Sequence, residues 1–313
     1  MNKNGLMLGL FSVAAYSLNT PLSRAIMLEG MTPITLLLLR FTLAGVVFSL
    51  IMRFSGLARA KEGQLGMNWQ GLSLALVGGV MNGFSGVSYY FGVLQLDASM
   101  AAMIGAAVYS VTALVIGSFI SNGLTPHTIL RLGLGLLGLF FLLGPTGGDI
   151  NLVGAGLVAL ASFIYGGYLV FIQKYLGDYN TSAVSELSIW GVVLVVAGFW
   201  LFDGGAIQVS SAAGWVTIVV QAIVVSIMAR FAMMVAIKKM GSGEYALLSP
   251  METLLAVLWS IIFLNESLSS GQIIGASLVL SGLLISGEWF ANRFNALFAG
   301  RRRPVLRRVP VAR

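Results

Sequence analysis

Long apolar runs separated by short connections occupy almost the whole chain. Because a helix needs roughly 20 apolar residues to span a bilayer, runs of that length are candidate transmembrane helices. Ten such runs lie at about 5–27, 33–53, 69–94, 98–120, 127–144, 153–173, 181–202, 213–237, 244–264 and 271–290. The longest connection, at about 54–68, leaves no room for a separate soluble domain. The pattern therefore predicts an all-α integral membrane protein with ten transmembrane helices.

The composition agrees with this fold class and excludes several kinds of function. Of 313 residues, 58% are hydrophobic and 9% are charged, whereas soluble domains average about 25% charged residues. The chain has no cysteine and a single histidine, His127. This excludes thiolate catalysis and a cysteine- or histidine-rich metal site. We therefore expect neither a metal nor a cofactor.

The basic residues follow the pattern of membrane topology. With the N-terminus inside, the inner segments hold 15 Lys and Arg residues, and the outer loops hold only Arg24. Such asymmetry predicts an N-in/C-in orientation in the cell (plasma) membrane, in a bacterium the inner membrane. The net charge of +7 thus does not indicate a nucleic acid partner. The basic tail at 291–313 is expected to contact anionic lipid headgroups.

The chain also carries a weak internal repeat. Residues 102–140 align with 246–284 at an offset of 144, with eight identities in 39 positions. This register places the fourth and fifth spans on the ninth and tenth. Five spans is an odd number, so the second repeat must be inverted in the membrane, a recurrent plan of secondary transporters with a site near the midplane. We expect two inverted five-helix repeats, 1–147 and 148–290.

Three stretches carry a family resemblance. SLNTPLSRAIMLEGMTPITLLLLRFTLAG (17–45) resembles the first hairpin of EamA-type transporters of the drug/metabolite transporter superfamily, and 96–120 and 244–285 resemble the fourth span and the last two spans. The motif residues are Pro33, Arg40, Phe41, Ala44, Pro250, Glu252, Leu264, Asn265, Glu266, Gly271, Ile274 and Gly282. The chain departs from many members at Ala106 and Val108. The resemblance implies ten helices in two inverted repeats, alternating access, and transport, often export, of a small organic metabolite.

Ionisable groups inside the spans are candidates for function. Arg230 and Glu252 lie at matching depths, on the order of 10–12 Å from the inner end of their spans. Two interpretations stay open: a structural ion pair, or a pair that opens between transport states or holds a zwitterionic substrate. Proton uptake by Glu252, and hence proton coupling, is also open. Arg40 has no acidic partner at its depth, which favours a structural arginine that caps carbonyls or snorkels outward.

Polar and aromatic side chains within the spans complete the candidate set for substrate binding or coupling. Each of them could serve helix packing or line a cavity. Together with the three charged residues, the set comprises Tyr16, Asn19, Arg40, Asn82, Tyr89, Tyr90, Tyr109, Tyr165, Tyr168, Trp190, Arg230, Glu252 and Trp259. Glu266, by contrast, is expected to be a solvated residue of the outer turn between the last two spans. Pro21 is expected to kink or start a helix.

These observations favour a secondary transporter that exports a small organic metabolite, such as an amino acid, by alternating access. A passive facilitator, or a drug/metabolite efflux protein of another substrate class, is the alternative. An intramembrane transferase is disfavoured because the sequence has no clustered acid–base or metal constellation. We therefore expect no enzyme activity. A small-molecule substrate and membrane lipids are the expected partners.

Overall fold

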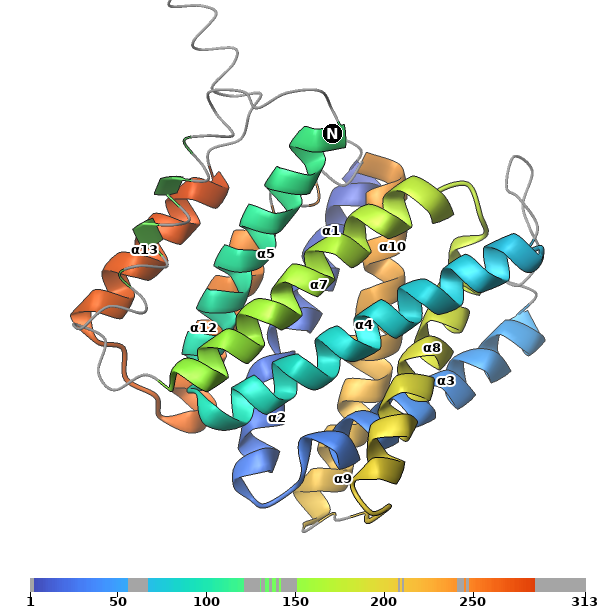
Figure 1. The fold of residues 1–313 in the computed structure, drawn as a ribbon, viewed down its shortest axis with the longest axis horizontal. Helices are drawn as coiled ribbons and strands as arrows, with labels where there is room; N and C mark the ends of the chain where they lie inside the picture. Colours follow the sequence, from blue (N-terminus) through green and yellow to red (C-terminus); the bar gives the residue numbers. More distant parts are fainter. Residues whose placement is uncertain are drawn as a thin grey trace, which may run out of the picture.

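The computed structural model describes residues 3–55, 67–120, 151–207, 209, 211–240, 245 and 248–284, with scattered positions between 130 and 141. Within these residues the fold is entirely helical, without β-strands (Figure 1). The helices are α1 (Lys3–Ser17), α2 (Asn19–Leu28), α3 (Pro33–Ser55), α4 (Trp69–Gln95), α5 (Ala98–Ile120), α7 (Leu152–Leu176), α8 (Thr181–Phe202), α9 (Ala212–Val220), η1 (Gln221–Ala229), α10 (Arg230–Met240), α12 (Ser249–Leu264) and α13 (Ser270–Leu284).

These elements correspond to nine of the ten predicted spans. Six helices are long and apolar enough to cross a membrane, and Ala98–Tyr109 and Met251–Leu264 are shorter apolar helices. The predicted span at 127–144 lies almost wholly outside the described residues, as does the tail at 291–313. The count of ten spans and their orientation therefore stay predictions.

Two predicted spans are irregular along their length. The first, described as the apolar stretch Asn4–Leu28, is divided at Leu18 into α1 and α2. Pro21 has no N–H to donate to the carbonyl of Ser17, four residues earlier, which explains a break at this point. The eighth span is one continuous helix, but its middle part, η1, is a π-helix that lies between the α-helices α9 and α10.

Helices from the two halves of the chain pack directly on one another. The long helix α4 lies along α7 and packs against α8, α5 lies along α7, and α1 lies along α10 (Figure 1). Gly79 of α4 and Gly191 of α8 form the closest crossing: a Cβ on Gly79 would lie 2.5 Å from the carbonyl oxygen of Ser188. Small residues let helix backbones approach in this way.

Many large apolar side chains face outward along these helices. Phe54, Phe84, Phe163, Leu194 and Ile262 are each at least 47% exposed. In water such a surface would favour aggregation, whereas a bilayer accommodates it without a free-energy penalty. The outward face of the bundle thus suits contact with lipid tails.

The turn between α4 and α5 is held by two charged side chains from elsewhere. Arg24 of α2 donates to the carbonyl oxygens of Val93 and Leu94 at the end of α4. Glu266 accepts from the backbone N–H groups of Ala98 and Ser99, at 2.7 and 2.9 Å, at the start of α5. Each charge complements the adjacent helix terminus. The expectation that Glu266 is only a solvated turn residue is therefore wrong.

A candidate substrate cavity between the two halves

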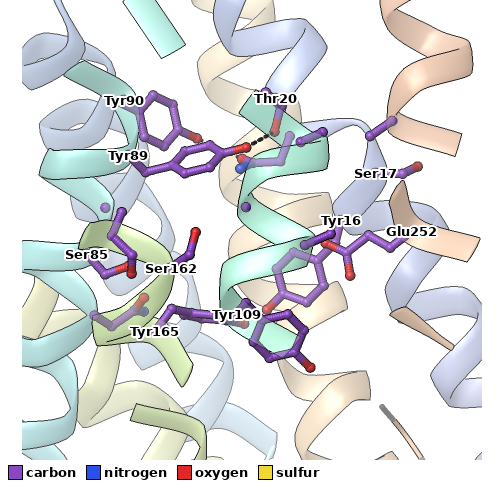
Figure 2. A pocket seen from close by; sticks show the side chains of 18 of the residues that line it. Tyr16, Ser17, Thr20, Ser85, Tyr89, Tyr90, Tyr109, Ser162, Tyr165 and Glu252 are labelled. Carbon is purple, nitrogen blue, oxygen red and sulfur yellow. Dashed lines mark hydrogen bonds between the residues drawn. The ribbon is translucent and has the colours of Figure 1, made fainter. Parts of the chain in front are cut away.

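Helices of both halves enclose a cavity of about 210 Å³. Its wall is built by α1 to α5 from the first half and by α7, α10 and α12 from the second. Figure 2 shows side chains of α1, α2, α4, α5, α7 and α12 around it. Tyr109 of α5 and Thr253 of α12, which are 144 residues apart, both face it. This is the offset of the weak internal repeat in the sequence.

The structure brings most of the predicted site residues to this cavity. Those that line it are Tyr16, Asn19, Arg40, Asn82, Tyr89, Tyr90, Tyr109, Tyr165, Arg230 and Glu252. Tyr168, Trp190 and Trp259 do not line it. This arrangement is a matter of position, and the part each residue plays in binding stays a prediction.

Arg40 is buried in a network of neutral groups. Its Nε donates to Ser226 Oγ at 2.7 Å, and one terminal nitrogen donates to the side-chain oxygens of Asn19, Tyr90 and Gln221, at 2.6, 2.5 and 3.1 Å. These partners come from α2, α4 and η1. Arg40 therefore neither snorkels outward nor caps carbonyls in the described structure. Arg40 lines the cavity, but its Nε and one terminal nitrogen are already occupied by neutral acceptors of the helix bundle.

Arg230 is arranged differently. With the Asn82 amide oxygen turned toward it, Asn82 accepts from both terminal nitrogens of Arg230, at 3.0 and 2.7 Å. One of these nitrogens also donates to the hydroxyl of Tyr168 at 3.4 Å. The Nε of Arg230 is buried and has no hydrogen-bond partner among the described residues. A buried N–H without an acceptor is costly, and this one belongs to a side chain that lines the cavity.

Glu252 does not pair with Arg230. The two side chains line the same cavity, but Arg230 is bound by the neutral groups Asn82 and Tyr168 instead. Of the two interpretations left open by the sequence, the structural ion pair is therefore not observed in this structure. The ion pair was considered because Arg230 and Glu252 lie at similar depths in the membrane. Whether they touch also depends on the direction in which each side chain points from its helix. Glu252 of α12 lies beside Tyr16 of α1 (Figure 2).

Tyrosine rings form much of the remaining wall. The rings of Tyr109 and Tyr165 are 6.0 Å apart between centroids, and those of Tyr89 and Tyr90 are 5.9 Å apart. The hydroxyls of Tyr89 and Thr20 are hydrogen-bonded at 2.8 Å. The cavity thus combines two unpaired charged groups with ring faces and hydroxyls, a lining that suits a small amphipathic ligand.

The three candidates that lie off the cavity have structural contacts. Trp190 of α8 donates to Ser49 Oγ of α3 at 3.1 Å. Trp259 of α12 donates to Ser17 Oγ at 3.1 Å. Tyr168 is almost fully buried, and its hydroxyl accepts a hydrogen bond from Arg230. Trp190 thus links α8 to α3, and Trp259 links α12 to α1.

Sequence reasoning missed several small polar residues of the wall. Thr20, Ser85, Ser162 and Thr253 line the cavity but carry no charge or ring that would single them out. Spacing was a usable signal, because Ser85 lies three residues after Asn82 on α4 and therefore shares its helix face. No three His, Cys, Asp or Glu residues within the described ranges lie close enough to hold a metal ion.

Comparison with known proteins identifies two copies of one family domain. A protein-family model described as "EamA-like transporter family" matches residues 3–144 and again residues 152–287. No curated protein matches the chain. Fourteen chains of solved structures match. One of them, described as "Crystal structure of protein", covers 94% of this chain and 99% of its own at 17% identity, with a TM-score of 0.64. At that identity the likeness shows a shared fold alone.

Proposed function

The chain belongs to the EamA-like transporter family, and from that premise we propose that it carries a small zwitterionic metabolite, such as an amino acid, across the membrane. Membership makes the chain a multi-pass membrane transporter of the drug/metabolite transporter superfamily, a family of transporters and not of enzymes. The substrate, the direction and the mechanism are the proposal. We infer alternating access with net export from the plasma membrane, in a bacterium the inner membrane.

One observation supports this substrate class above others. The cavity is lined by an arginine whose buried Nε–H has no partner among the described residues, and by a carboxylate that does not pair with it, Arg230 and Glu252. A substrate carboxylate would bind Arg230 in a charge-assisted hydrogen bond, and its ammonium group would bind Glu252. A zwitterion would thereby satisfy both groups at once, and its side chain would rest on the tyrosine rings. Phosphorylated substrates fit less well, because they call for more cationic groups.

Alternating access is supported by the arrangement of the halves. A single cavity built from equivalent helices of two repeats is what rocking of one repeat against the other requires. Arg230 and Glu252 would pair when the cavity is empty and reoriented, and separate when the substrate binds. The contact between Arg230 and Glu252 would stabilise the reoriented state of the empty carrier but not that of the substrate-bound carrier.

Counterflow in proteoliposomes tests the proposal. Purified protein is reconstituted with a high internal concentration of one unlabelled amino acid, and uptake of the same labelled amino acid is followed. We expect uptake above empty vesicles for some members of a panel, and its loss in Arg230→Met. Trp190→Phe, which alters an aromatic residue outside the cavity, is the matched control and should retain uptake. No counterflow for any amino acid would contradict the proposal.

The passive-facilitator alternative is separated in the same vesicles. A proton-coupled carrier should accumulate substrate against its gradient when a pH gradient is imposed. If Glu252 carries the proton, Glu252→Gln abolishes this accumulation, whereas counterflow, weakened by loss of the ammonium contact, remains measurable at a high substrate concentration. Accumulation that is absent from the wild-type protein, with counterflow intact, would favour a facilitator.

A further inference from the structure

The nine-residue π-helix η1 interrupts the eighth span immediately before Arg230. π-helices are rare, and most are single turns that often accompany functional sites. The apolar pattern of this span contains no glycine or proline at Gln221–Ala229 that would explain it. Contacts from outside the segment must therefore hold it in this form.

Arg40 supplies such contacts. It donates from Nε to Ser226 and from a terminal nitrogen to Gln221, two residues of η1 that are five positions apart. In an α-helix, residues five apart point about 140° away from each other. In a π-helix, where the hydrogen bond joins residue i to residue i+5, the two lie on the same side of the helix. One guanidinium can hold both side chains readily only in the π register.

The surrounding contacts reinforce this register. Gln221 and Ser226 are both fully buried, and Gln221 also donates to Ser23 Oγ of α2 at 2.9 Å. At the other end of η1, Ser12 of α1 donates to the carbonyl oxygen of Ala229 at 2.9 Å. Arg230 follows directly. The orientation of Arg230 therefore depends on the turn that precedes it.

We propose that Arg40 is a positioning residue that holds η1 in the π register and thereby directs Arg230 and Met233 into the cavity. If η1 relaxed toward an α-helix, its hydrogen-bond register would shift. A shift of one residue would rotate α10 by about 100° relative to α9. Arg230 would then turn away from Asn82 and from the cavity. The inference rests on the proposed function only in treating this cavity as the substrate site.

Two adjacent methionines report the register directly. Met233 lines the cavity, where Tyr165 contacts its sulfur at 3.9 Å. Met234 faces α8, where Ser185 contacts its sulfur at 2.8 Å. The chain has no cysteine, so Met233→Cys and Met234→Cys each introduce a single thiol. A small water-soluble methanethiosulfonate then measures which position faces the cavity.

The experiment compares the labelling rates of these two variants in three backgrounds. With the rest of the chain unchanged, position 233 should react at least about tenfold faster than position 234. Adding Gln221→Met and Ser226→Ala removes both contacts of Arg40 with η1, and this ratio should fall to about one or below. Tyr90→Phe removes a contact of Arg40 outside η1, and the ratio should stay high.

Two results would overturn the inference: an unchanged ratio after loss of the η1 contacts, or an equal fall in the Tyr90→Phe background. If the double substitution prevents purification, Ser226→Ala alone should lower the ratio by roughly threefold, and an unchanged ratio would count equally against the inference. Labelling requires no transport, so its failure leaves the proposed function standing. Absence of counterflow likewise leaves the labelling result intact.

Discussion

At the scale of residues, the two buried arginines differ in what they leave unsatisfied. Arg40 has neutral acceptors at two of its nitrogens and directs them into the bundle. Arg230 is supported by Asn82 and Tyr168 but retains a free N–H at its Nε. Burial alone would not separate them, because both are at most 6% exposed. The distinction depends on which side chains surround each guanidinium.

Asn82→Asp tests whether the charge of Arg230 serves a ligand. The new carboxylate would pair with both terminal nitrogens of Arg230 and neutralise it. The variant should therefore be at least as stable as the parent in thermal unfolding, because the pair has good geometry. Substrate counterflow should nevertheless fall by about tenfold or more, equivalent to ~1.4 kcal/mol of lost binding. Full transport by a stable Asn82→Asp protein would show that Arg230 does not bind the substrate by its charge.

At the scale of elements, Glu266 stabilises the start of α5 from a distant turn. Glu266→Gln should reduce the free energy of unfolding by about 1 kcal/mol, because it weakens a charged cap at a helix N-terminus. Chemical denaturation in detergent measures the change. Asp97→Asn is the control: Asp97 is exposed in the same turn, so its substitution removes the same charge without the two hydrogen bonds of Glu266. Equal losses in both variants would mean that only net charge matters.

The crossing of α4 and α8 is a second element-scale feature. A Cβ on Gly191 would lie 2.7 Å from Cα of Gly79 and 2.8 Å from the carbonyl oxygen of Leu76. Backbone atoms cannot move aside locally, so Gly191→Ala should force the helices apart and lower the melting temperature. Gly198→Ala on the same helix meets no atom within 4 Å and should be neutral or slightly stabilising, since Ala favours helix. A melting temperature of Gly191→Ala that is not below that of Gly198→Ala would contradict this prediction.

At the scale of the whole molecule, the distribution of basic residues predicts which loops face the cytoplasm. Ser267→Cys in the turn after α12 should react with an impermeant thiol reagent added outside intact cells. Asp178→Cys in the turn between α7 and α8 should react only after the membrane is opened. Both residues are exposed in the structure, and the parent chain contributes no thiol. The reverse pattern would contradict the N-in/C-in orientation.

The sequence predicted the broad architecture because apolar length and motif content reflect single elements. The spans at 33–53 and 181–202, for instance, agree closely with α3 and α8. Most polar and aromatic side chains chosen from the spans lie at one cavity, because few other places inside a membrane protein tolerate them. These features require no knowledge of how distant helices rotate against each other.

The features that were missed all depend on tertiary contacts. The π register of η1 leaves no mark in the apolar pattern. The cap by Glu266 joins residues 168 positions apart. Depth along a helix suggested that Arg230 and Glu252 meet, but it carries no information on the direction of either side chain. For η1, and for Arg230 and Glu252, the sequence does not give the rotation of each residue about its helix axis.

Arg230 and Glu252 are proposed to bind the opposite charges of one small ligand in the cavity. Calorimetric titration of the purified protein tests it, with an amino acid that shows counterflow, its amide (without the carboxylate) and its deaminated analogue (without the ammonium). We predict that loss of the ligand carboxylate weakens binding to the parent by about tenfold or more but does not weaken binding to Arg230→Met. Loss of the ligand ammonium should likewise weaken binding to the parent but not to Glu252→Gln. Equal affinity of the parent for all three ligands would contradict the account.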